Sequence, residues 1–458
     1  MDDVKVSENG PTEHQQTGSQ PAASQQTGSQ QTDGFIEQVI AQITEGDFSR
    51  KWEGIKQFSQ KVSQLSSESF SGGRDRLVLA LIHCLKNTTD TENQWFLVRA
   101  LGQFDRPDVV KALAHLLVTT SAEDIQLEVI QALTHLGNST ITTLSDLLCV
   151  WQPLAQRLLA ARTLAKIRRS ATIEPLLSVA DDAEVEIRTI ALEALGSFHD
   201  PRITPVLLAA LDDQGPLCVE AIRTLGRRPD LLSTIDLLGS LQRCLHHSEI
   251  AVARESAVAL GRLGGESAAI ALGEALIEPL PTAVRVSIAR ALGWIDTPAA
   301  TEALTLAFAQ TVPEMMPAVK QEIARSLGQT RLADLKINAA QPLIQWLQAV
   351  YLERSTTLPR LGALAARSEL VAFEAASFKL KQAVVTAVAR LGVSEACDSL
   401  IPVLGDPDSR IRLYALSALK QIAPKTAQVQ ARAYLSFLKE SLSDPQVQEH
   451  VAATLLAW

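Results

Sequence analysis

The chain has 458 residues, of which 46% are hydrophobic but only 4% aromatic. This composition favours helices over a β-sandwich or barrel. The formal net charge of −9 argues against a general nucleic-acid binder, which would need an excess of basic residues. No apolar run is long enough for a transmembrane helix, and the polar, acidic N-terminus is unlike a signal peptide. The five cysteines have no CxxC spacing, so we expect a reduced, cytoplasmic setting.

The N-terminal tail, residues 1–33, contains no Leu, Ile, Phe, Tyr or Trp and repeats the hexapeptide QQTGSQ at 15–20 and 25–30. Such a segment cannot bury enough apolar surface to offset the entropy of ordering it, so we expect it to be disordered. It could act as a tether or partner-binding arm, or as a solubilising tail. Residues 34–90 are expected to form atypical capping helices in front of a repeat array over 91–458.

A short helical pattern recurs through this array. The triplet ALG begins the copy ALGQFDRPDVVKALAHLL at residue 100, and its Leu marks the anchor of each copy. The anchors are Leu101, Leu133, Leu164, Leu195, Leu225, Leu260, Leu292, Leu327, Val388, Leu419 and Leu455. As far as Leu327 they stand 30 to 35 residues apart, which indicates stacked helix pairs, a solenoid. The interval from Leu327 to Val388 is 61 residues, about two periods, so we expect a degenerate repeat near 330–375.

Each copy carries the pattern of one buried helical face. The residue before the anchor is always small, and apolar residues recur at most of the positions three, four and eight before it. We expect the small residues to let neighbouring helices approach closely, and the Gly after the anchor to end the helix in a left-handed conformation. Basic residues stand seven before the anchor in six copies, and we expect them to pair with acids of neighbouring repeats such as Asp182 or Asp406. They are Arg157, Arg188, Arg285, Lys320, Lys381 and Arg412.

The pattern resembles HEAT repeats, and among them the short variety named after the phycobilisome lyases. Its consensus, D-P-x-x-V-R-x-x-A-x-x-A-L-G-x-x-x-D, is matched well by DDAEVEIRTIALEALGSFHD (181–200) and DPDSRIRLYALSAL (406–419). The resemblance covers about 91–458 and implies an all-α fold, an α-solenoid of about eleven to twelve helix pairs. It implies no activity by itself, because the consensus residues are packing residues.

The sequence offers little for catalysis, and we predict no catalytic, cofactor or metal site. Cys244, His246 and His247 could suggest zinc, but neighbouring residues of a helix point about 100° apart and no second cluster follows. His83 and Cys84 are adjacent and also face different ways, which disfavours a nucleophile with its base. The sequence has no glycine-rich phosphate loop.

A basic ladder is predicted on the second helix of each copy. Positions two before and two after the anchor lie four residues apart, so they share one stripe away from the buried face. Of the twenty residues there nine are basic and only Glu193 is acidic; the basic ones are Arg99, Arg162, Lys166, Arg223, Arg227, Arg262, Arg290, Arg325 and Arg390. Trp294 stands two after its anchor, on this stripe, and Trp95 stands six before its anchor, one helical turn further along the same stripe. Both are candidate contact residues, whereas Trp151 and Trp346 are expected in the core. Alternatively, cations after the anchor only stabilise the helix C-terminus.

These residues predict a non-enzymatic protein-binding scaffold whose concave basic surface holds an acidic protein partner and no nucleic acid. The family resemblance suggests a photosynthetic antenna or photosystem component as the partner, in a cyanobacterium or plastid and at the thylakoid surface through that partner. The alternative, implied by the resemblance alone, is a phycobilin lyase or bilin-handling chaperone, with bilin as its ligand. We also expect that changing Arg162, Arg223, Arg290 and Arg325 together to Glu abolishes partner binding, because these residues share one groove that is otherwise nearly free of acids. The fold should stay intact, because exposed Arg-to-Glu changes on helices alter stability little.

Overall fold

The computed structural model describes residues 71–310, 317–351, 366–422 and 424–441, with 47–53 and isolated positions near both ends. In this part of the chain the regular structure is α-helix with short 3-10 segments and no strand, which confirms the all-α prediction. None of the described helices is long and apolar enough to cross a membrane. The tail, 1–33, and the last predicted anchor, Leu455, lie outside the described residues.

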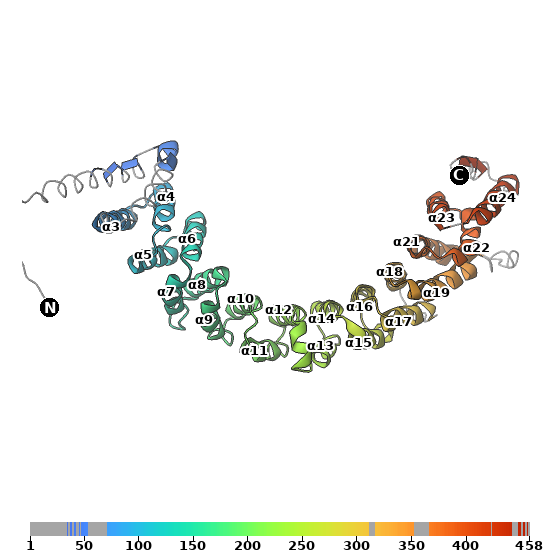
Figure 1. Ribbon diagram of the computed structural model, residues 1–458, viewed down its shortest axis with the longest axis horizontal. Coiled ribbons are helices and arrows are strands. Elements are labelled where there is room, and N and C mark those ends of the chain that lie inside the picture. Colours follow the sequence, from blue (N-terminus) through green and yellow to red (C-terminus); the bar gives the residue numbers. More distant parts are fainter. Residues whose placement is uncertain are drawn as a thin grey trace, which may run out of the picture. The chain divides into compact units, whose positions relative to one another are not determined.

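The chain divides into two compact units, Met1–Ala194 and Leu195–Trp458. In the first unit the helices form two layers, and we call these the second-helix layer, which carries the anchors, and the first-helix layer (Figure 1). The second-helix layer contains α4 (Thr91–Leu101), α6 (Glu123–Leu136), α8 (Leu154–Ile167) and α10 (Val185–Leu195). The first-helix layer contains α3 (Ser71–Asn87), α5 (Pro107–Thr119), α7 (Ile141–Leu147) and α9 (Ile173–Leu177).

The second unit continues the same alternation. Its second-helix layer contains α12 (Pro216–Leu225), α14 (Ile250–Leu263), α16 (Thr282–Ile295), α18 (Pro317–Leu327), α21 (Ala366–Leu391) and α23 (Ser409–Ile422), and neighbours in this order contact one another. The first-helix layer contains α11 (Ile203–Ala209), α13 (Leu237–Cys244), α15 (Gly265–Ile277), α17 (Pro298–Ala309), α19 (Ala333–Tyr351) and α22 (Cys397–Leu400), and α24 (Lys425–Ser441) follows. Within this unit the second-helix layer lies on the concave side (Figure 1). The solenoid prediction is therefore confirmed.

The anchors and the apolar positions before them form the core. In α16 the side chains of Leu292, Ala289, Ile288 and Val284 are fully buried at the spacing of one helical face. Full burial of a Leu, Ile or Val side chain stabilises a fold by about 1.5–3 kcal/mol. The face that the sequence pattern predicts as buried is thus the face that holds the array together.

The glycine after the anchor serves close packing instead of a left-handed helix end. Gly102 and Gly226 have φ of −59° and −65°, in the right-handed region. A Cβ added at Gly226 would lie 2.6 Å from the Cβ of Ala259, the small residue before the next anchor. The left-handed ending predicted for these glycines is therefore wrong, while the predicted close approach at small residues is confirmed. Left-handed residues do occur three positions later, at Arg168 and Asp296.

Residues 352–365, in the middle of the 61-residue interval, lie outside the described residues. Helix α18 contacts α21 directly in the second-helix layer, and α17 contacts α19 in the first-helix layer. A Cβ at Gly328 would lie 2.7 Å from the Cα of Ala387, which is the glycine contact that joins other neighbouring repeats. The degenerate repeat predicted near 330–375 falls partly on residues that the structure does not describe, so it stays a prediction. Two long helices account for much of the extra length, since α19 has 19 residues and α21 has 26.

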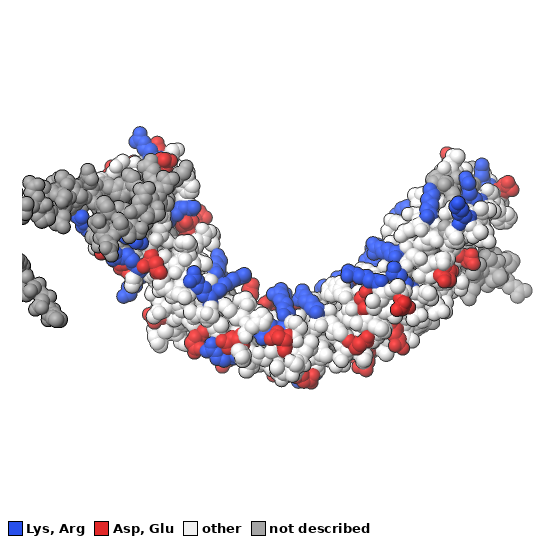
Figure 2. Space-filling model, viewed as in Figure 1, with Lys and Arg blue, Asp and Glu red and all other residues white. Residues whose placement is uncertain are grey.

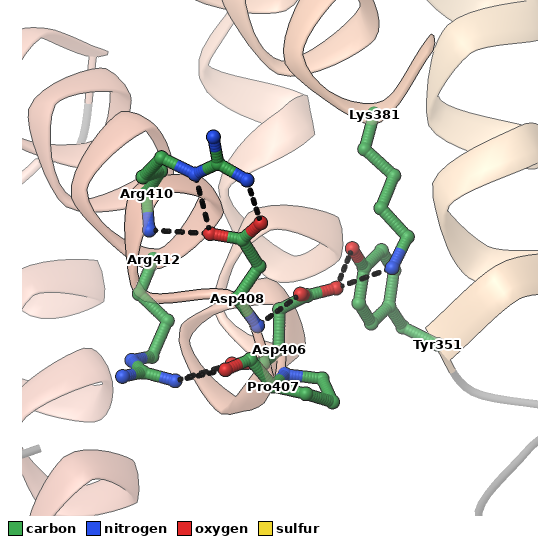
Figure 3. A network of polar contacts seen from close by, with 7 residues as sticks. All are labelled: Tyr351, Lys381, Asp406, Pro407, Asp408, Arg410 and Arg412. Carbon is green, nitrogen blue, oxygen red and sulfur yellow. Dashed lines mark hydrogen bonds and ion pairs between the residues drawn. The ribbon is translucent and has the colours of Figure 1, made fainter. Parts of the chain in front are cut away.

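Two of the basic residues seven before an anchor form buried ion pairs with the next repeat. Lys381 Nζ lies 2.7 Å from Asp406 Oδ2, and Arg157 pairs with Asp182. The carboxylate of Asp406 is 1% exposed and also accepts from the hydroxyl of Tyr351 at 2.7 Å (Figure 3). These two pairs confirm the prediction that such residues bind acids of neighbouring repeats.

The other four basic residues at this position also contact the main chain or an aromatic ring. Arg188, Arg285 and Arg412 donate to main-chain carbonyl oxygens at 2.6 to 3.0 Å. Lys320 Nζ lies 5.9 Å from the ring centre of Phe308, and burial lowers its pKa. These contacts join each of the four side chains to a neighbouring turn or helix, which indicates a structural role for the position.

Candidate functional site

The predicted ladder residues lie along the second-helix layer of each unit. In the first unit, α4 carries Trp95 and Arg99, and α8 carries Arg162 and Lys166. In the second unit, the helices from α12 to α21 and the residues just after α12 carry Arg223, Arg227, Arg262, Arg290, Trp294, Arg325 and Arg390. Figure 2 shows Lys and Arg gathered along the concave side of the second unit, with most of the visible Asp and Glu toward its convex side.

Glutamates pair with most of these arginines. In a cross-repeat pair, an Arg two before one anchor contacts a Glu of the following second helix. The N–O distances are 3.6 Å for Arg99 with Glu128, 2.6 Å for Arg162 with Glu186, 3.5 Å for Arg223 with Glu255, and 2.8 Å for Arg290 with Glu322. Further pairs lie within one helix, at 2.5 Å for Arg223 with Glu220, 3.6 Å for Arg262 with Glu255, and 3.4 Å for Arg325 with Glu322.

The expectation of a groove nearly free of acids is therefore wrong. It counted two positions of each repeat and omitted the position five before the anchor, where Glu128, Glu220, Glu255 and Glu322 stand. The side chains of these glutamates are only 10–19% exposed, whereas the arginines paired with them are 37–52% exposed. The guanidinium groups thus cover the carboxylates and form the outer surface of the ladder.

Three ladder cations lack an acid within reach. Among the residues that the structure describes, Lys166, Arg227 and Arg390 form no ion pair, and all three are exposed. Each stands two positions after an anchor, at a helix C-terminus, where a cation is favoured by the helix dipole. They are the ladder cations whose charge is not already satisfied inside the protein.

Reversing the charge of Arg290 should destabilise the second unit, contrary to the sequence-based expectation for such changes. In Arg290→Glu the new carboxylate lies beside Glu322, whose side chain is 11% exposed and loses the nearer of its two arginine partners, at 2.8 Å, while Arg325 stays at 3.4 Å. We expect a loss of about 1.5–3 kcal/mol, measured by urea unfolding. The control is Arg162→Glu, because Glu186 is 58% exposed and its pair contributes under about 1 kcal/mol. Equal losses in both variants would contradict a structural role for the covered glutamates.

The first cross-repeat pair, Arg99 with Glu128, is also part of an aromatic cluster. The guanidinium of Arg99 lies 5.1 Å and 5.0 Å from the ring centres of Trp52 and Trp95, which stack at 6.1 Å. Trp95 also contacts Phe96 edge to face at 5.0 Å. Burial raises the pKa of the Glu128 carboxyl, while Arg99 and a hydrogen bond from Trp95 oppose the shift. Trp95 and Arg99 therefore pack the segment 47–53 against α4.

The other three tryptophans considered in the sequence differ in how exposed their side chains are. Trp294 is 49% exposed on α16, as a contact residue should be. Trp151 is 81% exposed, so its prediction as a core residue is wrong. It follows α7 in the turn before α8, where no neighbouring helix covers it. Trp346 on α19 is partly buried.

The residues considered for zinc are engaged in other contacts. His246 Nε2 lies 2.6 Å from Glu278 Oε2, and the ring of His247 accepts from the backbone N–H of Glu249 at 3.1 Å. The thiol of Cys244 donates to the main-chain carbonyl oxygen of Ser240 at 3.4 Å. Among the described residues, no group of three or more His, Cys, Asp or Glu could hold a metal ion.

Comparison with known proteins identifies the repeats. A family model described as HEAT repeats matches residues 78–149 and 154–226, and the same helix pairs continue through the second unit. Residues 78–149 and 154–226 are therefore HEAT repeats. A comparison with curated protein sequences found no match.

Solved structures of low sequence identity share the fold. Kap95p, from a study of its complex with RanGDP, is 13% identical with a TM-score of 0.52, over 95% of this chain and 65% of Kap95p. An importin beta structure is 12% identical with a TM-score of 0.52, over 92% of this chain and 65% of importin beta. This chain therefore spans about two thirds of the length of these proteins. The CpcE–CpcF complex of phycocyanin lyase from Nostoc sp. PCC7120 is 18% identical over 62% of this chain and 94% of that chain, and its TM-score of 0.29 supports no argument about function.

Proposed function

We propose that this protein is a non-enzymatic scaffold whose second-helix layer binds an acidic protein partner. The observation that carries the proposal is the charge layering of the ladder: exposed guanidinium groups lie over glutamates that are mostly covered. A partner approaching this face meets cations first, and complementary charge favours both the rate and the orientation of docking. The proposed function needs no cofactor, because the side chains themselves provide the binding surface.

The fold supports the same proposal. Stacked repeats expose a long surface whose side chains do not carry the fold, so that surface is available for recognition. Kap95p, which shares the fold, is described as binding RanGDP. A photosynthetic antenna or photosystem partner, a cytoplasmic location and the bilin-handling alternative stay predictions from the sequence resemblance.

The scaffold proposal is tested by removing unpaired charges from one face. In the variant Lys166→Gln, Arg227→Gln and Arg390→Gln, no described ion pair is lost, so the fold should persist. The matched control removes three cations from the first-helix layer, Lys111→Gln, Arg243→Gln and Lys336→Gln. Tagged wild-type protein and both variants are incubated with extract from the native source, and captured proteins are quantified by mass spectrometry.

We expect an acidic protein that wild type and the control capture equally and that the ladder variant captures at least tenfold less. The difference should shrink as salt is raised, because salt screens exposed charges. Equal capture of every protein by the two variants would contradict the proposal.

A further inference from the structure

Among the described residues, Arg325 on α18 is the one of the five arginines two before an anchor that has no glutamate partner on the following second helix, α21. At three other steps, an Arg two before one anchor contacts a Glu five before the next: Arg99 with Glu128, Arg223 with Glu255, and Arg290 with Glu322. After Arg325, the corresponding position five before Val388 is Ala383, which is 6% exposed. The contact between α18 and α21 therefore has the arginine of a cross-repeat pair but lacks the glutamate.

Arg325 turns back to its own helix instead. Its Nη1 lies 3.4 Å from Oε2 of Glu322, three residues earlier, and the other oxygen of that carboxylate already accepts from Arg290 at 2.8 Å. Arg325 therefore shares a carboxylate that another guanidinium holds at a shorter distance. The side-chain amide of Gln321 also faces this guanidinium, with its oxygen 2.6 Å from Nη2 of Arg325. The Arg325 side chain is nevertheless 52% exposed, and a guanidinium has five N–H donors, so it can bind a further acceptor.

A cavity of about 320 Å³ occupies the place of the missing glutamate. The small side chains of Ala383 and Thr386 belong to its lining, together with Gln329, Gln382, Arg325 and Arg390. Arg390 has no ion-pair partner among the described residues. The cavity is larger than the roughly 30 Å³ that one water molecule occupies, so it can admit a side chain.

These groups suit an oxyanion. Two guanidinium groups present planar sets of N–H donors that match the two oxygens of a carboxylate, and such charge-assisted hydrogen bonds are among the strongest in proteins. The amides of Gln329 and Gln382 can add neutral donors. A carboxylate that enters the cavity would take the place of the glutamate that is missing at position 383.

We propose that this cavity binds a glutamate or aspartate side chain of the protein partner, in place of the missing ladder glutamate. This inference rests on the proposed scaffold function for the source of the carboxylate. It names the point of the second-helix layer at which an acidic partner is anchored.

The first test uses a defined probe, a fluorescein-labelled glutamate-rich peptide, with binding followed by fluorescence anisotropy. Arg390→Gln should weaken binding at least tenfold. Arg243→Gln should weaken it less than twofold, since Arg243 is exposed on α13 of the first-helix layer and does not line this cavity. Equal losses in the two variants would overturn the proposal. So would displacement of the peptide by inorganic phosphate at concentrations where the dicarboxylate glutarate has no effect.

The second test places the missing carboxylate at position 383 of the chain itself. Ala383→Glu should pair with Arg325, fill the cavity and abolish peptide binding while the melting temperature is maintained. Ala383→Gln fills the same space without charge and should compete less well for Arg325. Wild-type affinity in a folded Ala383→Glu variant would overturn the proposal. Because the probe is a defined peptide, such a result contradicts this anchor site alone, whereas the capture experiment tests the scaffold itself.

Discussion

Replacing Asp406 by alanine is expected to lower the free energy of unfolding of the second unit by about 3–5 kcal/mol, because it leaves the buried ammonium of Lys381 without its counter-ion. Lys381 Nζ lies 2.7 Å from Asp406 Oδ2, and the two side chains are 10% and 1% exposed. The substitution also deprives the Tyr351 hydroxyl and the backbone N–H of Asp408 of their acceptor. Urea unfolding followed by circular dichroism measures the loss.

The control for this prediction is an ion pair at the surface. Glu186→Ala removes the partner of Arg162, but both side chains are more than half exposed, so the loss should stay under about 1 kcal/mol. The double variant Asp406→Ala and Lys381→Met should recover much of the stability, since it removes the uncompensated charge. A loss at Asp406 no larger than that at Glu186 would contradict the structural role of the buried pair.

Replacing Gly226 by alanine is expected to destabilise the second unit by about 1–3 kcal/mol through overpacking between α12 and α14. The added Cβ would lie 2.6 Å from the Cβ and 2.8 Å from the Cα of Ala259, and the second of these is backbone that cannot swing aside. The better helix propensity of alanine, at most about 1 kcal/mol, does not offset this contact. Urea unfolding again provides the measurement.

The compensating variant separates packing from propensity. Ala259→Gly alone should cost about 1 kcal/mol, because it places glycine inside a helix. Combined with Gly226→Ala it should relieve the clash, so that the double variant is more stable than the sum of the two single changes predicts. Additive effects would show that the two residues do not control the approach of the helices.

Sequence periodicity could predict the fold because the pattern is the packing itself. The anchors and the small residues before them recur at fixed spacing, and in the structure they form the core and the contact between neighbouring helices. The pair of Lys381 with Asp406 could be predicted because both residues stand at regular positions of adjacent repeats. The 61-residue interval is ambiguous from the sequence, since length alone does not distinguish a second repeat from longer helices.

The chemistry of the candidate site was less accessible from the sequence. Whether Arg290 meets Glu322, 32 residues later, depends on how two helices are shifted along each other, and no local pattern reports that shift. The cavity beside Arg325 depends on the absence of a side chain at Ala383. That absence could have been noticed only by comparing the position five before each anchor, where glutamate recurs in four other repeats.

Docking of an acidic protein on the second-helix layer is tested most directly by arginine footprinting of the captured complex. Phenylglyoxal modifies exposed arginines, and mass spectrometry gives the extent of modification at each position with and without the partner. We expect the partner to protect Arg227 and Arg390 on the second-helix layer. Arg243, on α13 of the first-helix layer, should stay as reactive as in the free protein. Protection of Arg243 with Arg227 and Arg390 still reactive would contradict docking on the second-helix layer.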